Sequence, residues 1–324
     1  MTKIERIIIT SFPVAFILGK SKHWYLPGFE GVPLYDVGRF FLGQVKTVGL
    51  TERASAIAYN FIMAIPPSFL FLFTLIPHLP FIKKKDILKQ LTLIIKDIIP
   101  AEGYNKNIIN FIDDTFFKTP VFGLLSFGLL LALFFASNAM MGIMRSFNKN
   151  YIGFAKRKGL HDRWVAIRLT TLIFGLVLGC LILLITQGAA LKWFGLKSEF
   201  WRYLILYARW IVIIALVFYS IAFIYKYAPA VHKKWRLVSP GSILATFLCI
   251  LATLGFSEFV NNFGSYNALY GSIGTIIVLM ALIFINSLVL LIGFELNVSI
   301  KSLRAIAERR DAHEKELAGK EKNT

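Results

Sequence analysis

A glutamate at the end of a long apolar segment is the residue of this sequence best suited to chemistry. No charged residue occurs from Ser272 to Phe294, and Glu295 follows directly. At ~1.5 Å per residue, such a helical segment spans about the ~30 Å of a bilayer's hydrocarbon. A carboxylate at its end can face inward and bind a cation or a proton, or it can lie hydrated and hydrogen-bonded at the membrane boundary. The sequence leaves both interpretations of Glu295 open.

Asn286 lies near the middle of the same segment. At ~100° per residue, Asn286, Gly293 and Asn297 share one helical face, whereas Glu295 lies nearly opposite Asn286. One polar stripe therefore cannot include both Glu295 and Asn286. Asn286 is a candidate for lining a cavity, or it forms a hydrogen bond with a neighbouring helix.

Other polar side chains interrupt apolar segments and are candidates for lining a central cavity: Tyr59, Asn60, Ser137, Asn138 and Gln187. The alternative is hydrogen bonding between packed helices, which is their commoner role in membranes. Residues 175–179, GLVLG, form a Gly-x-x-x-Gly pattern, which suggests close contact with another helix.

Two adjacent prolines, Pro66 and Pro67, lie in the middle of the first apolar segment. Together they remove two backbone donors, so we expect the helix to kink or break there. In lipid, the freed carbonyls need protein or water partners, so this segment is expected to face other helices and to contribute to a cavity.

An arginine and a glutamate form a candidate structural ion pair. Arg209 lies about 9–10 Å inside the outer end of its segment by helical rise, farther than snorkelling fully reaches. Glu258 is its nearest candidate partner by depth. An ion pair between them is favoured over a transport site.

The residues that catalysis would need are scattered. A nuclease needs carboxylates or histidines grouped around a metal, but the five histidines lie in different loops, at positions 23, 78, 161, 232 and 313. His161 and Asp162 have no recognisable partner set, and the two cysteines, Cys180 and Cys249, are isolated in apolar runs. We predict that the protein is not an enzyme and has no catalytic residues, no metal and no cofactor.

The composition predicts the elements that hold these residues. Of 324 residues, 56% are hydrophobic, 17% are charged and 30 are phenylalanine, which is typical of a multi-pass helical membrane protein. The fold class is therefore predicted to be all-α, a polytopic bundle embedded in the lipid bilayer. Six spans are expected, at about 54–77, 120–143, 166–190, 203–227, 240–260 and 272–297.

The basic residues predict the orientation of these spans. Of the 36 Lys and Arg residues, 24 lie in residues 1–53, 144–165, 226–239 and the tail after 297, whereas 10 lie in the alternate loops. Because cytoplasmic loops are enriched in Lys and Arg, both termini are predicted to be cytoplasmic. This bias accounts for most of the net charge of +18 without nucleic acid as a partner.

The remaining segments are the two ends of the chain, which flank the membrane domain of residues 54–300, and a long loop within that domain. Residues 1–53 form an N-terminal cytoplasmic or interfacial segment, which begins with a short surface helix and includes an amphipathic helix over 34–50. The loop 78–119 predicts another amphipathic helix, on the outer surface or capping the bundle. Residues 301–324 form a charged cytoplasmic tail, which we expect to fray into solvent.

Four segments together resemble the YihY/BrkB family of bacterial inner-membrane proteins, formerly described as ribonuclease BN. They read ERASAIAYNFIMAIPPSFLFL, FFASNAMMGIMRSFNKNYIG, YKYAPAVHKKWRLVSPGSILAT and YNALYGSIGTIIVLMALIFINSLVLLIGFELN. The third contains a Tyr-x-x-x-Pro, a Trp-Arg and a Pro-Gly, and the fourth ends in Gly-x-Glu-Leu-Asn. The resemblance covers about residues 40–300; the chain departs from the pattern at Pro66-Pro67 and at Phe294.

The resemblance implies a six-span bundle in the bacterial cytoplasmic membrane but no single activity. The family's nuclease label is regarded as a misassignment, and transport-like or envelope roles have been suggested. Two function classes are therefore open. One is transport of a small ion or lipid-like solute through a cavity lined by spans one, two, five and six. The other is a non-transporting scaffold that organises a homo-oligomer or envelope proteins.

Overall fold

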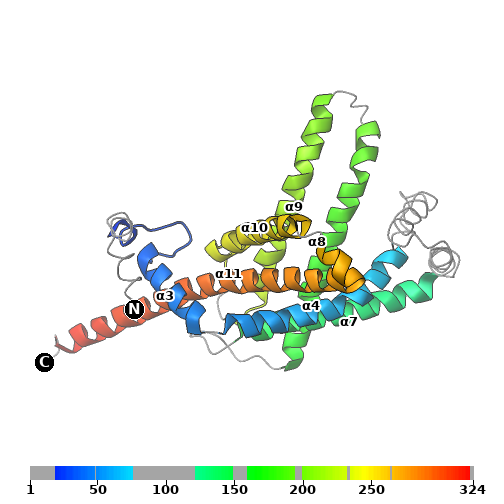
Figure 1. The fold of residues 1–324 in the computed structure, drawn as a ribbon. Coiled ribbons are helices and arrows are strands. Elements are labelled where there is room, and N and C mark those ends of the chain that lie inside the picture. Colours follow the sequence, from blue (N-terminus) through cyan, green and yellow to red (C-terminus); the bar gives the residue numbers. More distant parts are fainter. Residues whose placement is uncertain are drawn as a thin grey trace. The chain divides into compact units, whose positions relative to one another are not determined.

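A computed structural model describes residues 19–47, 49–75, 121–148, 159–193, 199–231, 234–262 and 265–321. Their helices, shown in Figure 1, are α3 (Leu34–Thr47), α4 (Leu50–Leu75), α7 (Val121–Phe147), α8 (Gly159–Trp193), α9 (Glu199–Tyr227), α10 (Pro240–Asn262) and α11 (Ser265–Glu321). Each of the six predicted spans coincides with one of the helices α4 and α7–α11. The predicted all-α class is therefore confirmed.

Five of these helices are long and apolar enough to cross a membrane, within the part of the chain that the structure describes. The stretches are Ser126–Phe147, Gly159–Cys180, Trp210–Tyr227, Pro240–Phe259 and Ile277–Arg310. Helix α4 covers the first predicted span but is not among these five, and only part of its side chains is described. The predicted loop helix of 78–119 and the surface helix at the N-terminus lie outside the described residues.

The chain divides into two compact units. Unit 1 comprises Met1–Ala58, Ile143–His161 and Ile213–Thr324, and unit 2 comprises Tyr59–Gly142 and Asp162–Val212. Unit 1 therefore contains the start of α4, the end of α7, the first residues of α8, the C-terminal half of α9, and all of α3, α10 and α11. Helix α10 packs along α11 in this unit.

The C-terminal tail corrects one expectation. We predicted that residues 301–324 fray into solvent, but α11 continues without interruption from Ser265 to Glu321, a length of 57 residues. Apolar residues recur beyond the predicted end of the span at residue 297, at Leu303 and Ile306, so the helix keeps a face that can pack. The span and the tail are therefore one helix.

Helix α3 is the amphipathic helix that the sequence predicts near 34–50, and its apolar face packs on α11. The buried contact consists of Phe29, Val32, Val37 and Ile300, extended by Leu34, Leu296 and Leu303. This burial accounts for the docking of the short helix, since a helix of this length is marginal on its own in water.

Two tight turns lead into α3. Leu26–Phe29 is closed by a backbone bond of 3.1 Å and Phe29–Val32 by one of 3.0 Å. Gly28 has φ of 87°, and a Cβ there would lie 2.9 Å from the Pro240 side chain, so only glycine fits. In the second turn Glu30 also has positive φ, 53°, an uncommon conformation for this residue type. In this conformation the Glu30 side chain bonds to two residues of α11.

Glu30 connects these turns to α11. Its carboxylate accepts hydrogen bonds from Lys301 and from Arg304, the latter at 3.0 Å. Partial burial acts to raise the pKa of Glu30, but the hydrogen bonds and positive charges of Lys301 and Arg304 outweigh it and lower the pKa below its ordinary value.

We expect this contact to weaken in acid. Because the folded-state pKa of Glu30 is lowered, its contribution is complete above the unfolded-state pKa of about 4.3 and is lost as pH falls through the folded-state pKa. The Glu30 side chain is 24% exposed, so the effect should stay within about 1 kcal/mol. Thermal unfolding followed from pH 7 toward pH 3 should show an acid-side decline that Glu30→Gln reduces. An identical decline in both proteins would contradict the assignment.

Candidate functional site

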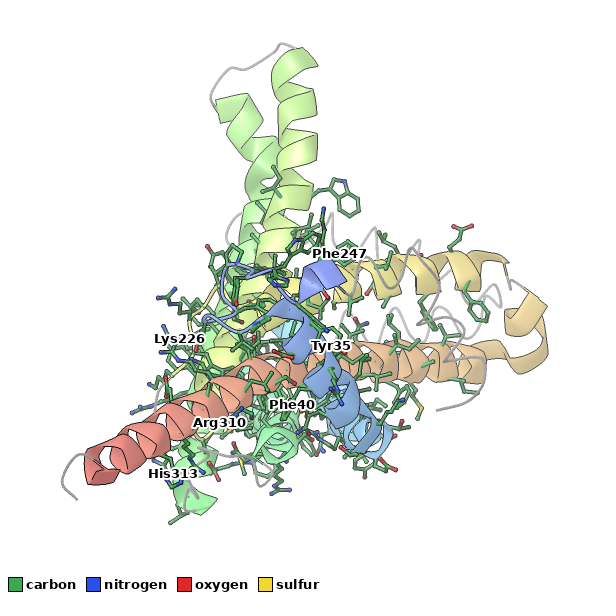
Figure 2. The ribbon with its side chains drawn as sticks, turned by 90° about the vertical axis from the view of Figure 1, so that its left-hand side faces the viewer. Tyr35, Phe40, Lys226, Phe247, Arg310 and His313 are labelled. Carbon is green, nitrogen blue, oxygen red and sulfur yellow. The ribbon has the colours of Figure 1, made fainter. Side chains whose placement is uncertain are left out.

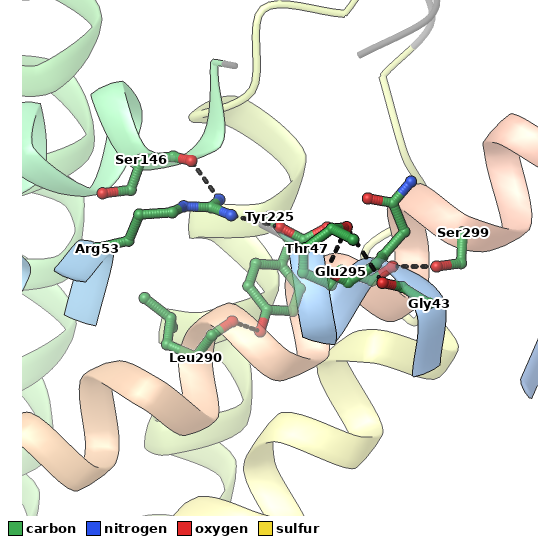
Figure 3. A network of polar contacts seen from close by, with 9 residues as sticks. Gly43, Thr47, Arg53, Ser146, Tyr225, Leu290, Glu295 and Ser299 are labelled. Atoms are coloured by element: carbon green, nitrogen blue, oxygen red, sulfur yellow. Dashed lines mark hydrogen bonds and ion pairs between the residues drawn. The ribbon is translucent and has the colours of Figure 1, made fainter. Parts of the chain in front are cut away.

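Glu295 is completely buried and forms an ion pair with Arg53, a residue 242 positions earlier in the chain. Arg53 Nη1 lies 2.6 Å from Glu295 Oε1, and the two side chains are 5% and 0% exposed. A second guanidinium nitrogen, Nη2, donates to the backbone carbonyl of Ser146. Figure 3 shows the three residues converging from α4, α7 and α11. The site therefore joins three helices of unit 1.

The positions of Arg53 and Ser146 within their helices explain this contact. Arg53 lies in the first turn of α4, and Ser146 lies in the last turn of α7. The last four carbonyls of a helix have no partner within it and carry partial negative charge. The Arg53 guanidinium therefore meets two acceptors, the α7 terminus and the Glu295 carboxylate. This arrangement compensates a charge that would otherwise be very unfavourable inside a membrane protein.

An aromatic cluster packs beside the ion pair. The rings of Phe147 and Phe294 stack with centroids 3.8 Å apart and an interplanar angle of 1°. Tyr225 meets both rings edge-on, at 5.9 and 6.2 Å, and Trp235 lies 5.4 Å from Phe294. All four side chains are buried. Because Phe294 precedes Glu295, the cluster helps to exclude water from the carboxylate, which strengthens its interaction with Arg53.

Tyr225 satisfies its own polar atom by bonding to α11. Its hydroxyl donates to the carbonyl of Leu290 at 2.6 Å, as Figure 3 shows. This contact places a polar tip on a buried aromatic ring, which is the usual arrangement for tyrosine inside proteins. It also anchors α9 to α11 one turn before Glu295.

Helices α10 and α11 approach each other through two glycines. A Cβ on Gly241 would lie 2.1 Å from the carbonyl oxygen of Gly293. A Cβ on Gly293 would lie 2.6 Å from Ala245 Cβ, from the Gly241 oxygen and from the Tyr225 hydroxyl. Small residues permit this kind of backbone contact between membrane helices. The contact fixes the part of α11 that carries Glu295.

Asn297 completes the junction by capping α10. Its Oδ1 accepts from the backbone nitrogen of Gly241 at 2.9 Å, and its Nδ2 donates to Ser239 Oγ at 2.9 Å. Ser239 in turn accepts from the backbone nitrogen of Ser242, and Ser242 Oγ accepts from that of Ser239. This is a reciprocal cap of the capping-box type, with Pro240 as the first helical residue.

Replacing Asn297 with alanine should weaken this cap. The change leaves the buried nitrogen of Gly241 without its acceptor, so we expect a loss of about 1–3 kcal/mol in the free energy of unfolding. Asn286→Ala in the same helix is the matched control. It should lose less free energy of unfolding, because one bond of Asn286 is made to the Leu282 carbonyl within α11 and does not hold another helix. Denaturation in mixed micelles measures both losses, and an equal loss for the two variants would contradict the capping role.

The structure assigns different surroundings to the two polar positions of α11 singled out in the sequence. The interpretation of Glu295 as a hydrated boundary residue is wrong, because Glu295 is completely buried against Arg53. Asn286 accepts from Cys249 Sγ at 2.8 Å and donates to Thr253 Oγ1 at 3.4 Å, both on α10. The predicted shared face of Asn286, Gly293 and Asn297 is confirmed, since all three contact α10.

Tyr59, Asn60 and Asn138 were candidates for lining a cavity, and all three lie in unit 2. Asn138 Oδ1 accepts from the Arg163 guanidinium at 2.5 Å. Asn60 packs on α7, where a Cβ at Gly142 would lie 2.9 Å from its Nδ2. Tyr59 is 60% exposed. A cavity lined by spans one, two, five and six would involve both units and stays a prediction.

Helix α4 continues through Pro66 and Pro67 to Leu75, so it does not break there, and a kink at these residues stays a prediction. In the Gly-x-x-x-Gly stretch, a Cβ at Gly175 or Gly179 would meet nothing within 4 Å. The close glycine contact lies instead between Gly241 and Gly293. The proposed pair of Arg209 and Glu258 remains a prediction, because the Arg209 side chain is outside the described part.

Sequence reasoning missed Arg53, which we counted only among the cytoplasmic basic residues. The signal that could have found it is the family-like segment ERASAIAYN, in which it stands before a long apolar run. Each of the four family-like segments contributes a residue to this site in unit 1: Arg53, Phe147, Tyr225 and Glu295, respectively.

Among the described residues, no three His, Cys, Asp or Glu side chains are placed to hold a metal ion. The predictions that the protein has no metal, no cofactor and no catalytic residue stay predictions, since other parts of the chain are not included.

The chain is similar to a family of membrane proteins over most of its length. The family model for virulence factor BrkB matches residues 41–318. A ribonuclease-like protein of Bacillus subtilis, YfkH, is 28% identical over 81% of this chain and 94% of its own length. UPF0761 membrane proteins of Chromohalobacter salexigens and Stenotrophomonas maltophilia K279a are 27% and 24% identical, over 76% and 82% of this chain. The chain spans only 58% and 61% of those two relatives. No solved structure matches.

Proposed function

Because the chain belongs to the BrkB family of membrane proteins, and because two of its family-like segments supply the two charges of a buried ion pair, we propose a transport-type function in the bacterial cytoplasmic membrane. In this proposal both termini are cytoplasmic, and the Arg53–Glu295 contact is the closed state of a gate. The solute class is a small ion or a lipid-like molecule.

The single observation that carries this proposal is the burial of a charged pair between helices distant in sequence. Removing two charges from water is so unfavourable that a buried ion pair adds little net stability compared with apolar residues of similar size. Ionisable groups within membrane proteins are usually retained because they serve solute or proton pathways. A pair that holds α4 against α11 and α7 is suited to opening and closing.

Opening such a gate requires new partners for both charges. When Arg53 and Glu295 separate, the carboxylate can take a cation or a proton, and the guanidinium can take an anionic group. A solute with a matching charge would therefore stabilise the open state more than the closed state, which is the condition for a ligand to shift such an equilibrium.

Flux through liposomes tests the proposal. The purified parent protein is reconstituted and assayed for proton, potassium and chloride movement with ion-sensitive dyes, and for transbilayer movement of fluorescent phosphatidylglycerol. Glu295→Gln keeps the side-chain shape and removes its charge, and Arg53→Gln replaces the guanidinium with a shorter, neutral polar side chain. Each should change the flux by about tenfold or more, given that a hydrogen bond to a charged group contributes ~1.5–3 kcal/mol. Glu30→Gln is the matched control, since it makes the same change in a partly exposed ion pair.

Two results would contradict a transport role for the pair. One is the absence of flux for the parent protein across the whole panel. The other is an unchanged flux in the folded Glu295→Gln and Arg53→Gln proteins.

A scaffold is the second candidate, and the continuous helix α11 favours it. This helix extends beyond its apolar part to Glu321 and carries α3 on its side, which offers a rigid platform for envelope proteins or for a second copy of the chain. Proximity labelling from the end of α11 should then identify the same neighbouring proteins around the parent protein and around Glu295→Gln. Liposomes that contain the parent protein should show no flux. Partner identities that change with Glu295→Gln would contradict this alternative.

We also propose that the protein is not a nuclease, although one relative is named ribonuclease-like. The scattered histidines of the sequence support this view. Purified protein supplied with Mg²⁺, Mn²⁺ or Zn²⁺ should not cleave RNA above a mock preparation. Cleavage that co-purifies with the protein and disappears with His161→Ala or Asp162→Ala would overturn it.

A further inference from the structure

A groove of ≈ 740 Å³ runs between α3 and the part of α11 beyond the ion pair. Its apolar lining includes Phe40 on α3 and Leu303 and Ile306 on α11, and its charged lining includes Arg39 and Arg310. Figure 2 shows Phe40 on α3 and Arg310 toward the C-terminal end of α11. The groove therefore combines an apolar floor with two cations.

These two cations differ from their neighbours on α11. Lys301 and Arg304 are neutralised by Glu30, and Arg304 also bonds to Glu308 at 2.7 Å. Within the described ranges, no carboxylate forms an ion pair with Arg39 or Arg310. Their charge is therefore available to an external anion. Asp36 is the acidic side chain in the lining, and it disfavours ligands with more than one negative charge.

The position of the groove along α11 indicates where that anion comes from. The stretch of α11 that is apolar enough to cross a membrane is Ile277–Arg310, so the groove lies at the end of a span. Leu303, Ile306 and Arg310 follow one another at helical spacing on one face. Apolar and basic residues alternating at the end of a membrane helix are typical of contact with anionic headgroups.

We propose that this groove binds one anionic phospholipid with a singly charged phosphodiester headgroup, such as phosphatidylglycerol. The phosphate interacts with Arg39 and Arg310, and an acyl chain lies against Phe40, Leu303 and Ile306. Arginine suits this role because its planar guanidinium matches phosphate oxygens. The inference is independent of the gate, because the groove residues are separate from Arg53 and Glu295.

The experiment measures stabilisation of the full chain by lipid. The detergent-purified protein is heated with added phosphatidylglycerol or with phosphatidylcholine of the same acyl chains. Phosphatidylglycerol should raise the melting temperature more, and Arg39→Gln/Arg310→Gln should weaken its apparent affinity about 25-fold, at about fivefold per arginine. Lys46→Gln/Arg309→Gln is the matched control, because it removes one charge from each of the same helices at exposed positions outside the lining.

A second variant tests the groove without changing its charge. Gly43 lines the groove, and a Cβ built there meets nothing within 4 Å. Gly43→Leu should fold at least as well, since leucine favours helix more than glycine does, and should reduce the phosphatidylglycerol effect by occupying the groove.

The outcomes separate the alternatives. The proposal is supported if phosphatidylglycerol stabilises Arg39→Gln/Arg310→Gln and Gly43→Leu less than the parent protein. The control Lys46→Gln/Arg309→Gln should be stabilised as much as the parent protein. Equal stabilisation by the two lipids would overturn the proposal, and so would an equal loss in the control, which would indicate only general charge attraction. Competition by free glycerol phosphate as strong as by the lipid would also overturn it. A change in oligomeric mass in place of a lipid effect would identify a second copy of the chain as the occupant and refute the lipid assignment.

Discussion

Gly241→Ala is expected to destabilise the protein by about 3 kcal/mol or more, because overpacking a close helix contact is among the most damaging core changes. The new Cβ would lie 2.1 Å from the backbone oxygen of Gly293. That atom cannot rotate away as a side chain can, so α10 and α11 must separate. Gly293→Ala should have a similar effect, since its Cβ would meet Ala245, Gly241 and Tyr225 at 2.6 Å.

Gly255→Ala is the matched control for this prediction. It lies on the same helix α10, and a Cβ there meets nothing within 4 Å. We expect Gly255→Ala to keep or slightly increase stability, since alanine favours helix more than glycine does. Thermal unfolding in detergent distinguishes the variants. A Gly241→Ala protein as stable as Gly255→Ala would refute the close approach of the two helices.

Glu295→Ala should lower the free energy of unfolding by about 3–5 kcal/mol, because it leaves the buried Arg53 charge without its carboxylate. Arg53→Ala should have a comparable effect, increased by the loss of its bond to the Ser146 carbonyl. The size of this loss in the free energy of unfolding reflects the unfavourable isolated charge and not the net contribution of the ion pair. Unfolding in mixed micelles measures the loss for each variant.

Replacing both partners with apolar residues separates these contributions. In Arg53→Met/Glu295→Leu no isolated charge is left, so much of the stability should return. If this protein is folded but has lost flux, the pair serves function more than stability. A double variant that is less stable than either single variant would contradict the account of an unfavourable isolated charge.

The helices were predictable from the sequence because apolar length is a local property. The six apolar segments coincide with α4 and α7–α11, and the shared face of Asn286, Gly293 and Asn297 followed from helical geometry alone. Burial of Glu295 was not predictable in the same way. A glutamate near the end of an apolar run has the same local pattern whether water or an arginine accompanies it.

The partner of Glu295 could not be found because it depends on tertiary contact. Arg53 lies 242 positions away, and its sequence neighbourhood looks like an ordinary basic flank of a span. Two other expectations also depended on local patterns. Local propensity predicted a kink or break at Pro66-Pro67, and α4 continues through both prolines without a break. Charge predicted a frayed tail, but α11 keeps an apolar face beyond residue 297, on which α3 docks.

A double-mutant cycle between Arg53 and Glu295 tests the central claim most directly. Arg53→Gln, Glu295→Gln and the double variant are unfolded alongside the parent protein under the same conditions. For a contact of 2.6 Å between buried charges, we predict a coupling free energy of about 1.5–3 kcal/mol. The double variant should then be more stable than the sum of the single losses implies. Additive losses, with a coupling near zero, would show that Arg53 and Glu295 do not form the pair on which the site depends.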